Sequence, residues 1–232
     1  MNLIYGRNPV EEASRGRRAV LQVWRTEATG APADLDDAVP VSVVTRDRLE
    51  ELSRSPDHQG IVAEVGPYPY VDAEELLASD EALVVALDQV QDPQNLGAIC
   101  RTAECAGVAG VVVPERRSAG VSAAVCKASA GAVEHLPIAR VTNLADFLGR
   151  ARKLGAWIYG ADADAPESYT GADYRGRAVL VLGGEGAGLR PRVRAACDLL
   201  VSIPMRGGTG SLNVSAAAAV LLFEALRQRG GA

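Results

Sequence analysis

The stretch from Leu180 to Gly230 constrains the fold of this chain more than any other part of the sequence. Two short apolar runs, at 178–182 and 199–203, each end in glycine or proline, and a long apolar segment follows them. Runs of this kind are typical of parallel strands that are covered on both faces. The long segment predicts a closing helix, for which Ser211 or Asn213 would serve as the N-cap.

The same stretch predicts a ligand site. Neighbouring strands that end in glycine loops leave backbone N–H and C=O groups unpaired at the carboxyl edge of a sheet, where α/β proteins bind ligands. Glu185 lies inside the first glycine loop, and a second loop, at 207–210, leads into the closing helix. A glycine loop beside a helix N-terminus favours a ligand with polar or anionic groups. These residues alone leave the identity of the ligand open.

Composition and charge exclude several classes of protein. An apolar content of 48% is ordinary for a globular chain of 232 residues, and the net charge of -5 provides no overall basic field for nucleic acid. The four cysteines form no CxxC pair and only two histidines are present, so we expect no metal site. No signal peptide is visible, and no apolar run reaches the ~20 residues of a membrane helix. We therefore expect a soluble, cytoplasmic protein without a membrane partner.

The order of the elements predicts two domains. Residues 1–66 alternate short strands and helices, and arginine outnumbers glutamate in their first half. Such an excess can contact phosphates, although a solvated charged face is its commoner explanation. Residues 67–80, proline-rich and then acidic, are typical of a linker. From 81 to 232, strands alternate with helices, which predicts an α/β domain with a mostly parallel sheet and helices on both faces.

Polar residues gather at the ends of three predicted strands. In the first cluster Asn95 stands at a helix start, where its simplest role is that of an N-cap. Arg101 follows two turns later among apolar residues, and a buried guanidinium needs an acidic partner or an anionic ligand. The other two clusters surround Glu185 and the triplet 211–213. No Walker lysine and no dinucleotide-type glycine spacing is present, so the residues predict an α/β ligand-binding domain without naming its reaction.

The three clusters, in this order, closely resemble the motifs of the SpoU (TrmH) family of RNA 2′-O-ribose methyltransferases. They read DPQNLGAICRTAECAGVAGVV at 92–112, LVLGGEGAGL at 180–189 and VSIPMRGGTGSLNVSAAAAVLLFEALRQR at 201–229. Residues 127–148, the opening IYGRNPVEEA and the segment HQGIVAEV are similar to the bacterial 23S rRNA branch of that family. The resemblance therefore covers nearly the whole chain.

The resemblance implies an architecture and partners. Residues 81–232 would form a SPOUT-like methyltransferase domain whose C-terminal part threads a trefoil knot, a rare exception to the rule that chains avoid knots. Residues 1–66 would form a small L30e-like α/β domain that binds the RNA substrate. The family is dimeric, so a homodimer is expected, in which the closing helix at 213–229 contributes apolar packing. S-adenosyl-L-methionine would be the methyl donor, bound in the knot.

The resemblance also implies roles for individual residues. The expected cofactor contacts are Leu182, Gly183, Gly184, Ile203, Met205, Leu212 and Asn213. The expected catalytic residues are Asn95, Arg101, Glu185, Ser211 and Asn213. Arg101 matches the arginine proposed as the family's base, but an arginine with a pKa above ~12 is a poor base. We assign it to holding a substrate phosphate and stabilising charge, and the others to orienting Arg101, the ribose and the cofactor. Gly210 departs from the larger residue often found there.

The function that follows is methyl transfer from S-adenosylmethionine to the ribose 2′-hydroxyl of a guanosine in 23S rRNA. A tRNA guanosine is a weaker candidate, because the tRNA branch resembles the second domain without the first. An adenosine of 23S rRNA, as in antibiotic resistance, would also suit the two-domain plan. A knotted RNA-binding protein without activity is the alternative from another class, and the presence of Asn95, Arg101, Glu185 and Asn213 argues against it. A small-molecule enzyme would leave the arginine-rich first domain without a role.

Overall fold

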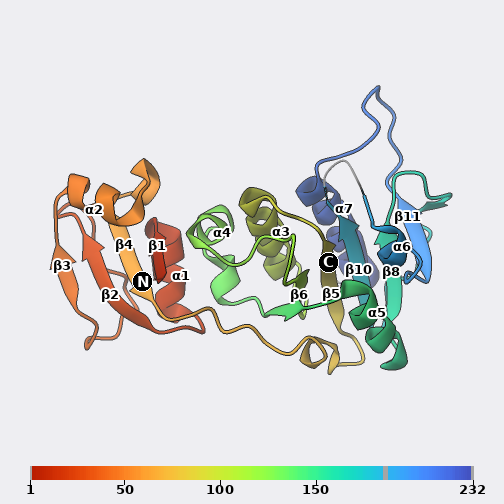
Figure 1. Cartoon of the computed structure of the whole chain (residues 1–232), viewed down its shortest axis with the longest axis horizontal. Helices are drawn as coiled ribbons and strands as arrows, with labels where there is room; N and C mark the ends of the chain where they lie inside the picture. The colour runs from red at the N-terminus through yellow and green to blue at the C-terminus, as the bar shows by residue number, and fades with distance from the viewer. Residues whose placement is uncertain (1, 185–187, 231–232) are drawn as a thin grey trace.

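Two separate β-sheets organise the chain, and they lie toward opposite ends of its long axis (Figure 1). The computed structural model describes residues 2–184 and 188–230. The first sheet has four strands in the order β1-β4-β2-β3. The second has seven strands in the order β7-β6-β5-β10-β8-β11-β9. The larger sheet and its helices carry the first and third polar clusters and the beginning of the second.

The first sheet is small and mixed. Strand β4 pairs antiparallel with both β1 and β2, and β2 pairs parallel with β3 at the edge. The elements are β1 (Asn2–Tyr5), α1 (Arg7–Arg15), β2 (Val20–Arg25), β3 (Val41–Val43), α2 (Arg46–Ser53) and β4 (Ile61–Val65). The expected small α/β unit is present, and its first strand, β1, was not predicted.

The second sheet is parallel throughout. Its strands are β5 (Leu83–Asp88), β6 (Gly110–Pro114), β7 (Ile138–Val141), β8 (Trp157–Ala161), β9 (Glu167–Ser168), β10 (Ala178–Gly183) and β11 (Leu199–Ser202). Its helices are α3 (Pro93–Cys105), α4 (Ala123–Ala128), α5 (Leu144–Lys153), α6 (Pro191–Arg194) and α7 (Val214–Gln228). The predicted α/β fold with a mostly parallel sheet is confirmed, and only the very short β9 and α6 were not predicted.

The central strand β5 explains why the sheet needs helices on both faces. All six of its residues are buried, and alternate side chains enter two different apolar clusters. Leu83, Val85 and Leu87 share a cluster with residues of α3 and α7. Val84 and Ala86 share the other with residues of α5. Because side chains alternate along a strand, a strand with apolar residues on both faces is buried when helices cover both faces of the sheet.

The helix starts follow capping chemistry. Asn213 Oδ1 accepts a hydrogen bond from Ser215 N at 2.8 Å, so Asn213, not Ser211, is the N-cap of α7. Helix α3 begins after Asp92, whose carboxylate accepts from Gln94 N at 2.9 Å. The prediction that Asn95 caps this helix is therefore wrong. An Asp-Pro pair starts a helix well, because the carboxylate accepts a first-turn N–H and proline suits the first position.

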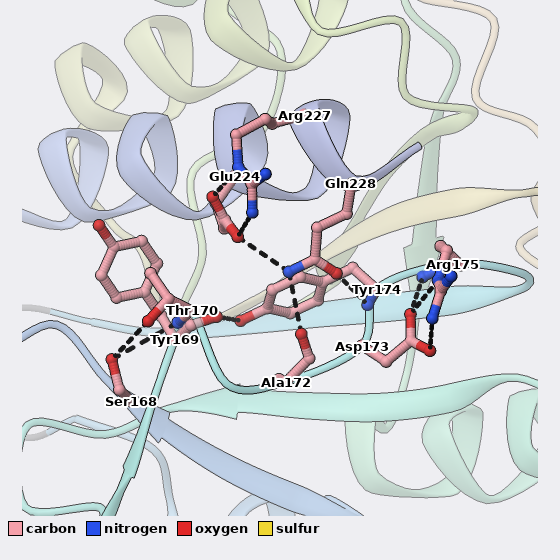
Figure 2. A network of polar contacts seen from close by, with 10 residues as sticks. All are labelled: Ser168, Tyr169, Thr170, Ala172, Asp173, Tyr174, Arg175, Glu224, Arg227 and Gln228. Carbon is pink, nitrogen blue, oxygen red and sulfur yellow. Dashed lines mark hydrogen bonds and ion pairs between the residues drawn. The ribbon is translucent and has the colours of Figure 1, made fainter. Parts of the chain in front are cut away.

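The C-terminal end of α7 is hydrogen-bonded to the segment that connects β9 and β10 (Figure 2). Gln228 Nε2 donates to Ala172 O at 3.0 Å, and Gln228 Oε1 accepts from Tyr174 N at 3.0 Å. Glu224 Oε1 accepts from Gln228 Nε2 at 2.8 Å and also from Arg227 Nη2 at 2.8 Å. The C-terminal turn of α7 is thus hydrogen-bonded to backbone groups of the β9–β10 connection, which is more than 50 residues away in the sequence.

No helix within the described residues is long and apolar enough to cross a membrane.

Candidate functional site

Strands β5 and β10 end side by side at the carboxyl edge of the second sheet. Asp88 is the register partner of Gly183, and Gly184 N donates to Asp88 O at 2.8 Å. A Cβ added to Gly183 would lie 2.2 Å from the carbonyl carbon of Gly188. The returning loop therefore passes too close to the strand end for any side chain at Gly183, which accounts for the glycine there.

A buried carboxylate, that of Asp88, binds the returning loop beside the end of β10. Asp88 is fully buried, and its two oxygens accept from Arg190 N at 2.8 Å and from Arg190 Nε at 2.7 Å. A buried carboxylate needs hydrogen-bond donors and a compensating positive charge, and Arg190 supplies both, so the two residues fix where the chain returns after the glycine loop. Neither residue was predicted from the sequence. The available signal was an acid at the end of an otherwise apolar strand.

A hydrogen bond joins the first and third polar clusters. Asn213 Nδ2 donates to Asn95 Oδ1 at 3.0 Å, across 118 positions of sequence. Asn95 is buried in the first turn of α3, and Asn213 is the N-cap of α7. A buried amide is costly unless it is hydrogen-bonded, so this pair determines how the starts of the two helices meet.

A cavity of about 660 Å³ opens beside this pair. Its walls come from the ends of β8, β10 and β11 and from the segment that leads into α7. All seven residues expected to contact the cofactor line it: Leu182, Gly183, Gly184, Ile203, Met205, Leu212 and Asn213. Gly210 and Ser211 line it as well, and a Cβ at Gly210 would meet no atom within 4 Å. The structure therefore gathers residues of two distant motifs around one cavity.

The same cavity has charged walls that were not predicted from the sequence. Asp162, Asp164 and Arg194 line it. Arg194 Nε donates to Asp162 Oδ2 at 2.7 Å, and this hydrogen bond holds the pKa of Asp162 below its usual value. The Asp-Ala-Asp sequence directly after the apolar run of β8 was the signal, because polar residues at that edge of a parallel sheet face the ligand site.

A smaller cavity borders Asn95, the other member of the asparagine pair. It measures about 200 Å³ and is lined by Asn95, Val214 and the loop at 89–92. Gln89 in that loop has a φ of 64°, which is left-handed and strained for a residue other than glycine. The Asn213 side of the pair thus borders the large cavity, and the Asn95 side borders the small one.

The remaining expected site residues lie apart or outside the described chain. Arg101 is exposed, lines neither cavity, and forms no ion pair with residues 2–184 or 188–230. The prediction that its guanidinium is buried is wrong, because Arg101 lies on the outer face of α3 while Ile99 and Ala103 turn inward. Glu185 lies outside the described residues. In the part of the chain that is described, no group of three or more His, Cys, Asp or Glu side chains could hold a metal ion.

Comparison with known families assigns both parts of the chain. Residues 82–223 match the SpoU rRNA Methylase family. Residues 3–71 match the RNA 2′-O ribose methyltransferase substrate binding family. The chain is also 37% identical to the putative TrmH family tRNA/rRNA methyltransferase YacO of Bacillus subtilis, over 97% of this chain and 95% of the relative.

Solved structures agree with these matches. The SpoU methyltransferase AviRb of Streptomyces viridochromogenes, in complex with AdoMet, superposes with a TM-score of 0.82 at 26% identity, over 97% of this chain and 89% of that one. An AdoMet-bound rRNA methyltransferase from Sinorhizobium meliloti gives a TM-score of 0.82 at 27% identity, over 97% and 87% of the two chains. The likeness spans both sheets.

Proposed function

The chain belongs to the SpoU rRNA methylase family, and we propose that it transfers the methyl group of S-adenosylmethionine to the ribose 2′-hydroxyl of a guanosine in 23S rRNA. The observation that carries this proposal is the hydrogen bond between Asn95 and Asn213. It joins two motifs of the family, and Asn213 lines the large cavity while Asn95 lines the small one. A methyl donor held near Asn213 and a ribose held near Asn95 can be aligned by this hydrogen-bonded pair for direct transfer of the methyl group.

The large cavity suits S-adenosylmethionine. Its volume of about 660 Å³ falls within the ordinary range for small-molecule sites. Apolar side chains such as Leu182 and Ile203 suit an adenine ring, and the carboxylates of Asp162 and Asp164 suit a ligand that carries positive charge. When bound, the cofactor supplies a methyl group on a positively charged sulfur. Two of the similar solved structures contain this cofactor, which supports the assignment.

We assign the small cavity to the acceptor ribose. Asn95 borders it, and Asn213 holds Asn95 from the cofactor side. Ser211, on the wall of the large cavity, and Glu185 would orient the ribose and the cofactor. Arg101, exposed on the same helix as Asn95, would hold an RNA phosphate, since a guanidinium forms two parallel bonds to phosphate and rarely gives up its proton.

The RNA substrate is supported by the first sheet. We propose residues 1–66 as the L30e-like domain that binds RNA, 67–80 as the linker and 81–232 as the methyltransferase domain, with the trefoil knot in its C-terminal part. The match of residues 3–71 to a substrate-binding family favours rRNA over tRNA, because this part would be superfluous on a substrate that the second domain recognises alone. An rRNA substrate implies a cytoplasmic location for the protein.

We also propose that the protein works as a homodimer. Helix α7 presents an outward apolar row in which Ala216 and Phe223 are exposed and Val220 is half-buried. Residues spaced by four and three lie on one helix face, so the row can pack against a second copy of the same helix.

Transfer of tritium from labelled S-adenosylmethionine tests the reaction. Fragments of 23S rRNA and total tRNA are incubated separately with the enzyme, and nuclease digestion then identifies the labelled nucleotide. We expect label only in 23S rRNA, on a 2′-O-methylguanosine. Label on an adenosine or in tRNA would replace the proposed substrate, and no label in any RNA would overturn the proposed activity.

A further inference from the structure

An ion pair is buried between the two sheets, away from both cavities. Arg18 follows α1, and Glu134 lies in the turn after α4; their side chains are 6% and 0% exposed. Arg18 Nε donates to Glu134 Oε2 at 2.7 Å, and Arg18 Nη2 donates to Glu134 Oε1. Arg18 Nη2 also donates to Cys126 Sγ at 3.1 Å. Burial raises the pKa of Cys126 to about 12, so this thiol is neutral. The positive charge of Arg18 is therefore balanced by the carboxylate of Glu134.

The connecting segment is part of the same cluster. Tyr68 places its ring under the guanidinium of Arg18, 5.6 Å from centroid to Cζ. The Tyr68 hydroxyl shares its one hydrogen between Val133 O and Leu136 O, each 2.9 Å away. A tyrosine that is bonded at its tip and stacked on its face has little freedom to move. The chain between the two sheets is therefore attached at its beginning and is not a free tether.

Close backbone approach tightens the junction. A Cβ at Gly16 would lie 2.7 Å from Glu134 Cβ, and a Cβ at Gly131, whose φ is +92°, would lie 2.6 Å from Glu12 Cβ. Lys127 Nζ donates to Asp57 O at 3.0 Å across the same boundary. Glycines at both crossing points allow the two parts of the chain to touch without side chains between them.

The apolar core runs through this boundary. Ile4, Val10 and Ala13 of the first unit belong to the same buried cluster as Val125 and Val133 of the second. In Figure 1, α4 lies between the first sheet and α3. Because protein cores are packed as densely as crystals, a shared core resists relative motion of the parts that build it.

We propose that Arg18 and Glu134 are positioning residues that lock the first sheet to the second, so that RNA bound by the first reaches the acceptor cavity at one fixed distance. The effect on RNA rests on the proposed function, whereas the rigid attachment of the first sheet to the second does not. A buried pair is held only when both partners are present, since either charge alone is left uncompensated. The planar fork of Arg18 meets both carboxylate oxygens and so fixes direction as well as distance.

The rigidity of the junction can be measured without any RNA. Spin labels are attached to Cys105, which is exposed on α3, and to a cysteine introduced by Glu51→Cys on α2, with Cys197→Ser as background. We expect one narrow distance distribution in the starting protein and a broadened one after Glu134→Gln, which keeps the size of the side chain but removes its charge. Asp173→Asn, which breaks an exposed ion pair with Arg175, is the matched control and should leave the distribution unchanged.

The kinetic consequence separates positioning from general damage. Glu134→Gln should raise the KM for 23S rRNA at least tenfold and leave the Kd for S-adenosylmethionine within twofold. The double variant Arg18→Met with Glu134→Leu, which replaces both charges by apolar volume, should restore the narrow distribution and most of the RNA affinity. If Glu134→Gln does not fold, Arg18→Lys, which keeps the charge but loses the fork, should broaden the distribution and raise the KM for RNA.

An unchanged distance distribution after Glu134→Gln or Arg18→Lys would overturn the lock. Loss of cofactor affinity in parallel with RNA affinity would also overturn it, because the pair would then support the methyltransferase fold and not the position of the RNA. If the starting protein methylates no RNA, the proposed function fails while the distance measurement still decides whether the junction is rigid.

Discussion

At the scale of single residues, Asn213 has two separable roles. Its Oδ1 caps α7, and its Nδ2 donates to Asn95. Asn143 provides a matched control, because it caps α5 through bonds to Ala145 N and Asp146 N and lines neither the large nor the small cavity. We expect Asn143→Ala to cost about 1 kcal/mol of unfolding free energy and to leave methyl transfer unchanged. Asn213→Ala should show a similar loss of stability and at least a hundredfold slower single-turnover transfer. Equal transfer rates in the two variants would remove Asn213 from the site.

Gly183 gives a second prediction at this scale. Gly183→Ala would place a methyl group 2.2 Å from Gly188 and push the loop at the cavity wall. We expect affinity for S-adenosylmethionine, measured by calorimetry, to fall at least tenfold, or about 1.4 kcal/mol. Gly207→Ala is the control, because a Cβ there would meet no atom within 4 Å. Unchanged cofactor affinity in Gly183→Ala would show that the backbone at Gly188 can move away from the added methyl group without disturbing the cavity.

Site residues that belong to a sequence motif could be predicted, whereas single charged residues of the same site could not. The strand pattern predicted the glycine loops at one edge of the sheet, whereas the individual cofactor contacts were expected only from the resemblance to the SpoU family motifs. Asp88, Asp162 and Arg194 stand at the same edge, but single charged residues after apolar runs carry no motif of their own. Arg101 was expected to be buried because its neighbours in sequence are apolar, yet helical geometry turns it outward while Ile99 and Ala103 turn inward.

At the scale of elements, the fastening of α7 predicts a dependence of stability on pH. The side-chain hydrogen bond from Arg227, with that from Gln228, lowers the pKa of Glu224 to about 2, whereas an unfolded glutamate has a pKa of about 4.3. A carboxyl group whose pKa is depressed by folding stabilises the protein above pH ~4.3, and this contribution is lost as the pH falls toward 2. We expect Glu224→Gln to flatten the change in unfolding free energy between pH 5 and 2. A slope identical to that of the unchanged protein would mean that the pair contributes nothing.

Elements were more predictable than their ends. Long apolar runs identified the buried strands and the closing helix, since only a sheet with helices on both faces can bury them. The two-residue strand β9 and the four-residue helix α6 have no periodicity to detect, and they form because the surrounding chain holds them. The start of α3 was misassigned by one turn because Asp92 and Asn95 are both good capping residues and only the structure shows which one accepts the N–H.

At the scale of the whole molecule, the outward face of α7 predicts the state of assembly. Phe223 is 51% exposed on a helix whose other face is buried in the core. A dimer that covers this row would bury the ring, and aromatic residues at the centre of an interface commonly contribute about 2 kcal/mol or more. Phe223→Arg should therefore convert the protein to a monomer in sedimentation equilibrium, with an unchanged far-UV spectrum. Val43→Arg, at a valine that is 56% exposed on β3, is the control and should leave the dimer intact. If Phe223→Arg remains dimeric, another face joins the two copies, and if the starting protein is a monomer, the apolar row of α7 needs a different explanation.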